Sequence, residues 1–192
     1  EGQTVLFNVI AEDSGINDEL TYLWNFGDGN VDSNKSAQHQ FADNGEFDIY
    51  ITVKDDDGGI SSLSKKLLIK NIPPVLEATF PKKQHEGKKV KIDAKVKSDS
   101  GTDDTHTYQF DYGDGTISSD PFHIYQDNGE FTIQAMLFDD DGGSDTISQQ
   151  IEIVNLPPKI LGELQSNSNE GELVSFELSV EDPGNLDTHT YF

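Results

Sequence analysis

The stretch YLWNFGDG at Tyr22–Gly29 returns in a related form as YQFDYGDG at Tyr108–Gly115. Aromatic side chains occupy alternate positions in both stretches, which is typical of a strand with one buried face. Each strand then ends in Gly-Asp-Gly, without the following helix and lysine that a phosphate-binding loop needs. We therefore predict two equivalent hairpin turns, with Trp24 and Phe110 packed between the sheets of a sandwich.

The rest of the chain repeats around these two stretches. Three openings align, at Glu1-Gly2, Glu86-Gly87 and Glu170-Gly171. The run Asp-Asp-Asp-Gly-Gly at 55–59 returns at 139–143. A spacing of roughly 85 residues is the size of a small domain, which can fold by itself, unlike the short unit of a solenoid. The chain therefore reads as a tandem array of domains.

Short segments with alternating apolar residues fill each repeat, and none shows a helical period. Strands of this length at regular intervals predict an all-β fold of antiparallel sandwiches. We expect a first repeat at 1–72 without its first strand, a complete second repeat at 73–156, and the N-terminal part of a third repeat at 157–192. One expected strand is the segment that carries Val5, Phe7, Val9 and Ala11, repeated as Val90, Ile92, Ala94 and Val96, and again as Val174, Phe176, Leu178 and Val180.

The stretches Tyr22–Gly29 and Tyr108–Gly115 resemble the Trp-Asp-Phe-Gly-Asp-Gly signature of polycystic-kidney-disease (PKD) domains. Downstream, His39-Gln40-Phe41 and His123-Ile124-Tyr125, each followed by Gly-Glu-Phe, are similar to the His-x-Tyr and Gly-x-Tyr segments of that family. Phe110 replaces the tryptophan of the signature, and Asn25 replaces its aspartate. The resemblance implies tandem immunoglobulin-like (PKD-type) β-sandwiches used outside the cell, in surface-layer proteins, in adhesins or as accessory modules of secreted hydrolases.

Composition narrows the partners. Acidic residues outnumber basic ones by 36 to 13, and the formal net charge is −23. A surface this acidic disfavours nucleic acid and anionic lipid. No segment has the roughly 18 consecutive apolar residues of a membrane helix, so we expect no direct membrane insertion in this chain. Cysteine is absent, which excludes disulfides and Cys-ligated zinc.

Acidic residues fall in register in all three repeats. Counted back from Tyr22, Tyr108 and Tyr191, one Asp lies nine positions earlier and another lies four positions earlier. In an immunoglobulin-like sandwich this loop lies at the same end as the Asp-Asp-Asp-Gly-Gly turn and the linker. So many oxygen ligands suit Ca²⁺, which takes six to eight of them. The predicted ligands are Asp13, Asp18, Asp55 and Asp57 in the first repeat, Asn71, Asp99, Asp104, Asp139 and Asp141 for the second, and Asn155, Asp182 and Asp187 for the third.

A second interpretation of the same residues stays open, because Asp and Gly favour turns through side-chain bonds to nearby backbone N–H groups. No nucleophile motif or zinc-ligand spacing appears, so we expect no catalysis. His39 and His123 are expected to make half-buried hydrogen bonds.

The favoured function is a non-catalytic extracellular array, in a surface layer or an adhesin stalk, stiffened by calcium and by Pro-Pro linkers. Its expected partners are neighbouring repeats, other copies in a lattice and extracellular polymers. The alternative function is an accessory substrate-binding or spacer module of a secreted hydrolase. Most aromatic residues occupy inward positions, which weighs against a flat binding platform.

Overall fold

The computed structural model describes residues 1–14, 18–162 and 167–191. Within these ranges all regular elements are β-strands. The described residues include no helix that is long and apolar enough to cross a membrane. Contacts divide the chain into two compact units. Unit 1 comprises Glu1–Val75, Val96–Thr107 and Leu137–Asp145, and unit 2 comprises Leu76–Lys95, Tyr108–Met136 and Thr146–Phe192.

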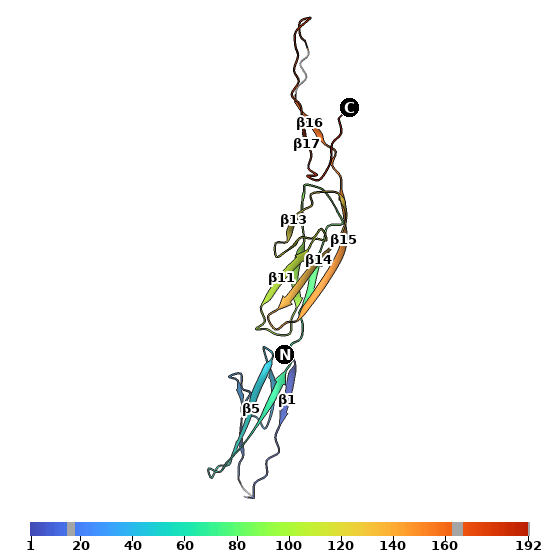
Figure 1. Cartoon of the computed structure of the whole chain (residues 1–192). Helices are drawn as coiled ribbons and strands as arrows, with labels where there is room; N and C mark the ends of the chain where they lie inside the picture. Colours follow the sequence, from blue (N-terminus) through green and yellow to red (C-terminus); the bar gives the residue numbers. More distant parts are fainter. Residues whose placement is uncertain (15–17, 163–166, 192) are drawn as a thin grey trace. The chain divides into compact units, whose positions relative to one another are not determined.

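The first repeat forms two facing sheets in unit 1 (Figure 1). One sheet has the strand order β3-β2-β5-β6, and the other pairs β1 with β4. The Gly-Asp-Gly segment closes the β2–β3 hairpin, and the Asp-Asp-Asp-Gly-Gly segment closes the β5–β6 hairpin, as predicted. The strands are β1 (Thr4–Asn8), β2 (Thr21–Asn25), β3 (Val31–Asp32), β4 (Ser36–Gln40), β5 (Gly45–Lys54) and β6 (Ile60–Ile69).

Alternate side chains of these strands form the core between the sheets. Trp24 is 5% exposed, and Phe26 and Phe41 are each 1% exposed. The Trp24 ring nitrogen donates a hydrogen bond to the carbonyl oxygen of Asn34 (3.0 Å), so its polar edge is satisfied while its rings are buried. Phe7 of β1 packs against Trp24 with ring centroids 5.6 Å apart. The predicted role of Trp24 as a core residue is confirmed.

The second repeat repeats this plan with additional strands. Its larger sheet has the order β12-β11-β14-β15-β8, while β13 pairs with β9 and β10 pairs with β7. Phe110 is 3% exposed, which confirms its predicted place in the core. The strands are β7 (Val75–Thr79), β8 (Lys83–His85), β9 (Lys89–Lys91), β10 (Asp93–Ser98), β11 (His106–Asp111), β12 (Ile117–Ser118), β13 (Phe122–Ile124), β14 (Gly129–Asp139) and β15 (Ser144–Val154).

The strand expected across Val90–Val96 is two strands. β9 pairs with β13, and after Ile92 the chain continues as β10, which pairs with β7. The Ile92 N–H donates to the carbonyl oxygen of Pro121 (2.9 Å) at this point. The alternation of apolar residues in the sequence continues where the chain changes from pairing with β13 to pairing with β7. The sequence pattern therefore predicted a single strand. In the first repeat, only Thr4–Asn8 of the corresponding segment is a strand, and Val9 and Ala11 lie beyond it.

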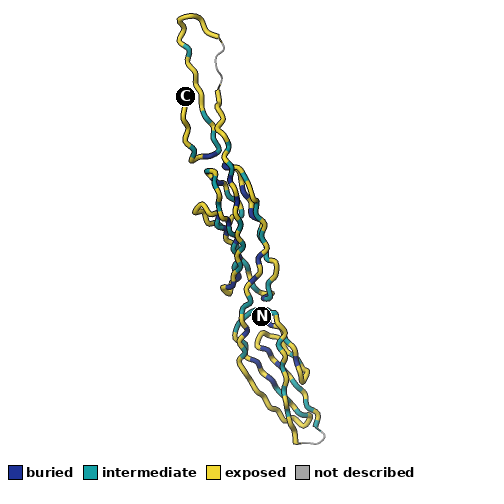
Figure 2. Tube along the Cα trace, turned by 90° about the vertical axis from the view of Figure 1, so that its right-hand side faces the viewer, coloured by how far each residue is buried: buried dark blue, intermediate teal, exposed yellow. Residues whose placement is uncertain are grey.

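The third repeat lacks most of one expected strand. Among the described residues of this repeat, only β16 (Lys159–Leu161) and β17 (Ser179–Glu181) are strands, and they form an antiparallel pair. Most of the strand expected over Val174–Val180 is irregular, and Phe176 and Leu178 are about half exposed. Figure 2 shows mostly exposed positions after residue 158, in contrast to the mixed burial of the first two repeats. Two short strands offer no opposing sheet against which an apolar face could be buried.

The two histidines predicted to be half-buried tie the Gly-Asp-Gly turns to the opposite sheet. His39 Nε2 lies 2.5 Å from the Asp28 carboxylate, and His123 Nε2 lies 2.6 Å from that of Asp114. The His39 ring stacks on Phe26 with centroids 4.2 Å apart. Burial alone would raise the pKa of Asp28, but the hydrogen bonds with His39 and Asn30 lower it overall. These pairs confirm a structural role for both histidines.

One buried hydrogen bond distinguishes the two cores and can be tested. The Tyr125 hydroxyl donates to the carbonyl oxygen of Tyr112 (2.7 Å), and both side chains are fully buried. We expect Tyr125→Phe to lower the unfolding free energy by about 1–2 kcal/mol, because the buried carbonyl loses its partner. Urea unfolding followed by fluorescence measures this loss. Tyr50→Phe, which removes an exposed hydroxyl, is the control, and an equal effect of both changes would contradict the prediction.

Candidate metal centre

The loops predicted to bind a cation meet inside unit 1. Asp99 and Asp104 lie on the loop between β10 and β11, and Asp139 ends β14 in the turn before β15. Asn71 follows β6 at the start of the linker, and its side-chain amide donates to Asp139 Oδ2 (3.0 Å). Three segments that are far apart in the sequence therefore bring oxygen ligands to one place, as the register of the acidic residues predicted.

Three overlapping groups of carboxylate oxygens form there, and within each group the atoms lie within 4.8 Å of one another. Asp104 belongs to all three groups. Together their seven residues are called the first acidic cluster below. The groups are Asp99, Asp104 and Asp139; Glu1, Asp43 and Asp104; and Asp104 with the exposed Asp140 and Asp141.

Backbone hydrogen bonds fix the orientation of the carboxylates. Asp139, which is 7% exposed, accepts the N–H groups of Asp141 (3.0 Å) and Gly143 (2.6 Å) on one oxygen. Asp99 Oδ2 lies 2.7 Å from His106 Nε2. Glu1 Oε1 accepts the N–H of Ile72 in the linker (2.6 Å). These bonds hold the carboxylates of Asp139, Asp99 and Glu1 in place.

The second repeat's loop docks directly on the first repeat. The Thr102 N–H donates to the carbonyl oxygen of Ala42 (2.8 Å). Gly2 has a φ of +65°, and a Cβ there would lie 2.4 Å from the carbonyl oxygen of Ser100. Only glycine fits this position, because the conformation is left-handed and the loop leaves no room for a side chain.

Several oxygens of the cluster are buried without a hydrogen-bond partner in the described part of the chain. They are Oε2 of Glu1, Oδ1 of Asn71, and both carboxylate oxygens of Asp104. Glu1 is 6% exposed. An unpaired polar oxygen away from water is costly, so each of these atoms needs a hydrogen-bond donor or a cation.

Repulsion within the cluster is visible in the acid–base behaviour of Asp104. Burial, and then the neighbouring charges of Glu1, Asp99, Asp141 and Asp43, raise the pKa of Asp104 to about 6. A bound divalent cation would reverse this effect, because it favours the ionised carboxylate.

An equivalent second acidic cluster lies within unit 2. Carboxylate oxygens of Glu86, Asp182 and Asp187 lie within 4.8 Å of one another. Glu86 is fully buried, and its Oε2 has no partner among the described residues. With its amide nitrogen turned towards the acids, Asn155 donates to Glu86 (2.8 Å) and Asp187 (3.2 Å). In the opposite orientation its oxygen would face the same carboxylates, an arrangement that a cation between them would stabilise. The loop again docks, since the Leu186 N–H donates to the carbonyl oxygen of Gln126 (3.4 Å).

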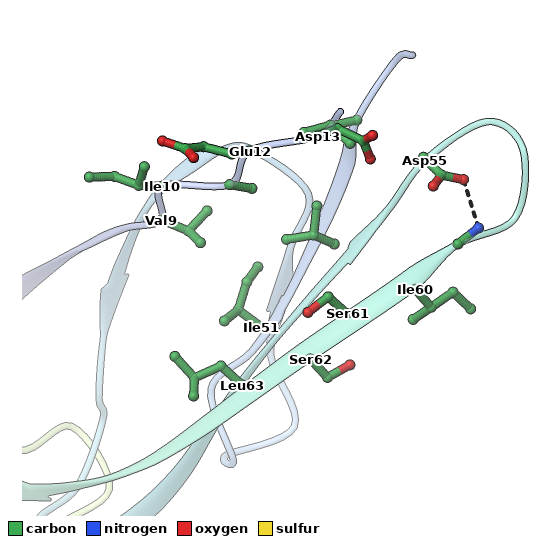
Figure 3. A pocket seen from close by; sticks show the side chains of 14 residues that line it. Val9, Ile10, Glu12, Asp13, Ile51, Asp55, Ile60, Ser61, Ser62 and Leu63 are labelled. Carbon is green, nitrogen blue, oxygen red and sulfur yellow. Dashed lines mark hydrogen bonds between the residues drawn. The ribbon is translucent and has the colours of Figure 1, made fainter. Parts of the chain in front are cut away.

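The predicted ligands of the first repeat form a weaker group. Asp13, Asp18 and Asp55 contribute oxygens within 4.8 Å of one another. Figure 3 shows Asp13 and Asp55 at the rim of an apolar hollow, with an Asp55 oxygen bound to the Gly59 N–H (2.7 Å). Asp57 is exposed and is not in this group. The bond of Asp55 to the Gly59 N–H is of the kind that Asp makes to nearby backbone in ordinary turns.

The sequence reasoning missed Asp140, which lies between the predicted Asp139 and Asp141. It also missed Glu1, Glu86 and Asp43, which belong to the preceding repeats. The signal was present, because the Glu-Gly pair opens every repeat and Asp43 recurs as Asp127. These residues lie at the end of a repeat that faces the following repeat's loops, so comparing equivalent loops within one repeat did not connect them.

Comparisons with known proteins agree with the fold. The PKD domain family model matches residues 1–69 and 71–154. Collagenase ColA of Clostridium perfringens is 39% identical over 54 residues, which are 28% of this chain and 5% of that protein. Collagenase ColA of Bacillus cereus is 31% identical over 96 residues, 50% of this chain and 10% of that protein. The chain thus spans a small part of these relatives. A solved PKD1 domain of Vibrio anguillarum Epp is 23% identical with a TM-score of 0.36, covering 44% of this chain and 96% of that domain.

The raised pKa of Asp104 predicts an unusual pH dependence without divalent cations. A carboxyl group whose pKa is higher in the folded chain stabilises the fold while it is protonated, and this stabilisation is lost as pH rises through the folded pKa. In EDTA we therefore expect the unfolding free energy to fall as pH rises from about 4 through about 6. Asp104→Asn should flatten this decline and raise the unfolding free energy at neutral pH by about 1–3 kcal/mol.

Urea unfolding in EDTA at a series of pH values measures both effects. Asp103→Asn is the matched control, because it removes the neighbouring exposed charge, which belongs to none of the carboxylate groups described above. Asp28 and Asp114 have lowered pKa values and titrate at lower pH. If the unfolding free energy depended on pH identically in the wild type and in Asp104→Asn, ionisation of Asp104 would not destabilise the fold, and the prediction would be wrong.

Proposed function

Because the chain belongs to the PKD domain family, we propose that it is a non-catalytic repeat array of a secreted or cell-surface protein, in which bound Ca²⁺ stiffens the connection between successive repeats. The observation that carries this proposal is the set of buried oxygens on Glu1, Asn71 and Asp104 that have no hydrogen-bond partner among the described residues. Glu86 supplies another at the second cluster. Both clusters lie where the loop of one repeat meets the end of the repeat before it.

The donor set suits calcium better than other metals. All available donors are carboxylate or amide oxygens, which are the hard ligands of Ca²⁺ and Mg²⁺. His106 is already paired with Asp99, and the chain has no cysteine, so the nitrogen and sulfur ligands of a zinc site are not offered. Mg²⁺ needs a strict octahedron and keeps several waters, whereas Ca²⁺ tolerates the irregular set presented here.

A cation at the first cluster would restrict the linker. Asn71 starts the linker, and Pro73-Pro74 follow it with fixed φ angles. Glu1 already accepts the linker N–H of Ile72, and Asp104 belongs to the next repeat. A cation held by Glu1 or Asn71 together with Asp104 would join both repeats and the linker, so its binding would remove hinge freedom.

The proposed setting is extracellular, where calcium is abundant and the acidic surface keeps the chain soluble. Extracellular calcium modules bind with dissociation constants on the order of 10⁻⁴–10⁻³ M, which would keep such a site loaded. A surface layer and an adhesin stalk are both compatible with this role. The collagenase relatives favour the role of spacer or accessory module in a secreted hydrolase.

Calcium should raise the thermal stability of the 192-residue chain. At a free concentration about a hundredfold above the dissociation constant, a ligand that binds only the folded state adds about 2.7 kcal/mol. For a chain of this size we expect a rise in Tm on the order of 5–10 °C. Calorimetry in EDTA, Ca²⁺ and Mg²⁺ at equal ionic strength measures the effect. Asp139→Asn with Asp141→Asn should remove the part of the rise that comes from the first acidic cluster, and the part from the second cluster should remain.

A matched control removes two exposed charges that belong to none of the carboxylate groups, by Asp103→Asn with Glu130→Gln, and should keep the calcium response. Stiffening is tested by spin labels on Ser64→Cys and Ser119→Cys, since the chain has no other cysteine. Calcium should narrow the distribution of distances between the labels. Equal melting curves in all three buffers would sink the proposal, and an unchanged distance distribution would leave binding without stiffening.

The accessory-module version makes a separate prediction, which the collagenase relatives motivate. A module that positions a hydrolase on its substrate should pull down with insoluble collagen, whereas a pure spacer should stay in the supernatant. Exposed aromatic side chains are scattered in the described residues, with Tyr50 48% and Phe122 40% exposed. We therefore expect no retention, measured by sedimentation with collagen fibrils in calcium buffer. Saturable retention would favour the accessory function.

A further inference from the structure

The first acidic cluster contains two inner groups of carboxylates that share one residue. Glu1 and Asp43 approach Asp104 from the first repeat. Asp99 and Asp139 approach it from the loops of the second repeat. No residue other than Asp104 is common to these two groups, so the cluster offers two adjacent sets of ligands.

The unpartnered oxygens are distributed over both sets. Both oxygens of Asp104 are buried and lack a hydrogen-bond partner within the described ranges. On the side of the first repeat, Glu1 is only 6% exposed, and its Oε2 also has no hydrogen-bond partner within the described ranges. Asn71, which is bonded to Asp139, lacks a partner at Oδ1 on the other side. A single cation would satisfy one set and leave unpaired oxygens in the other.

Charge counting favours two cations over one. The two inner groups contain five carboxylates, so one divalent cation would leave a net charge of −3 in a partly buried site, and two would leave −1. The second acidic cluster contains three carboxylates, and one divalent cation already leaves −1 there. Close like charges away from water repel strongly, so a site with a small residual charge is favoured. Two cations at the first cluster and one cation at the second leave the same residual charge of −1.

We propose that the first acidic cluster binds two divalent cations, bridged by the carboxylate of Asp104, and that Glu1 and Asp43 hold the second cation. This inference rests on the proposed calcium function and adds to it a second cation whose other ligands come from the preceding repeat. Each oxygen of Asp104 then contacts one cation, as carboxylates do when they bridge metals.

The chain supplies its own matched control for the second cation. Asp127 occupies in the second repeat the position that Asp43 occupies in the first, and each accepts the N–H of the following asparagine (2.8 and 2.6 Å). Asp127 nevertheless belongs to no carboxylate group in the described residues. Asp127→Asn therefore makes the same local change as Asp43→Asn without touching a proposed ligand.

Counting bound calcium tests the proposal. Equilibrium dialysis of the full chain against Ca²⁺, with metal measured by atomic absorption, gives the number bound for each variant. We expect Asp43→Asn to bind one cation fewer than the wild type, Asp104→Asn two fewer, and Asp127→Asn the same number. Melting in EDTA confirms that each variant is folded.

Manganese tests the bridge itself. Two Mn²⁺ ions sharing the Asp104 carboxylate should give a spin-coupled signal in electron paramagnetic resonance, and Asp43→Asn should convert it to an uncoupled one. The proposal is overturned if Asp43→Asn binds as many cations as the wild type, or if Asp104→Asn loses only one. Either result would leave single-cation stiffening intact, whereas a wild-type chain that binds no calcium would remove both proposals.

Discussion

Carboxylates that are buried side by side repel one another, and the ends of these repeats are built around that repulsion. Glu86 is fully buried and Glu1 nearly so, yet each retains an oxygen without a partner in the described structure. The backbone bonds from Ile72 and Leu156 hold these glutamates in place by their other oxygen. The docking of each loop on the preceding repeat therefore depends on how the excess negative charge is balanced, by protons or by cations.

The sequence predicted the sandwich well because local and tertiary signals agree there. Alternating aromatic residues end in Gly-Asp-Gly turns, and Trp24 and Phe110 are in the cores as expected. The prediction was wrong where alternation continues across a change of partner, as between β9 and β10. It was also wrong over Val174–Leu178, because an apolar alternating segment forms a strand only where a neighbouring strand and an opposing sheet exist.

For the candidate site, equivalent spacing found the loop carboxylates but not the residues of the preceding repeat. Asp99, Asp104 and Asp139 recur at fixed distances from recognisable strands, so their proximity could be inferred. Glu1 and Asp43 approach them only through the docking of Thr102 on Ala42, a contact that no periodicity encodes. The Glu-Gly opening was visible as a repeat, but its meaning depends on which loop covers the glycine.

That glycine has a consequence for arrays in which repeats are duplicated or from which a single repeat is excised. Gly2 and Gly87 leave no room for a side chain because Ser100 and Pro183 of the following repeat press against them. The constraint on one repeat is thus set by the repeat that follows it, and each acidic cluster is divided between two repeats in the same way. An excised single repeat carries two unmatched halves, so properties measured on it describe its severed ends. In the proposed array, complete acidic clusters number one fewer than the repeats, and every duplication of a whole repeat adds one.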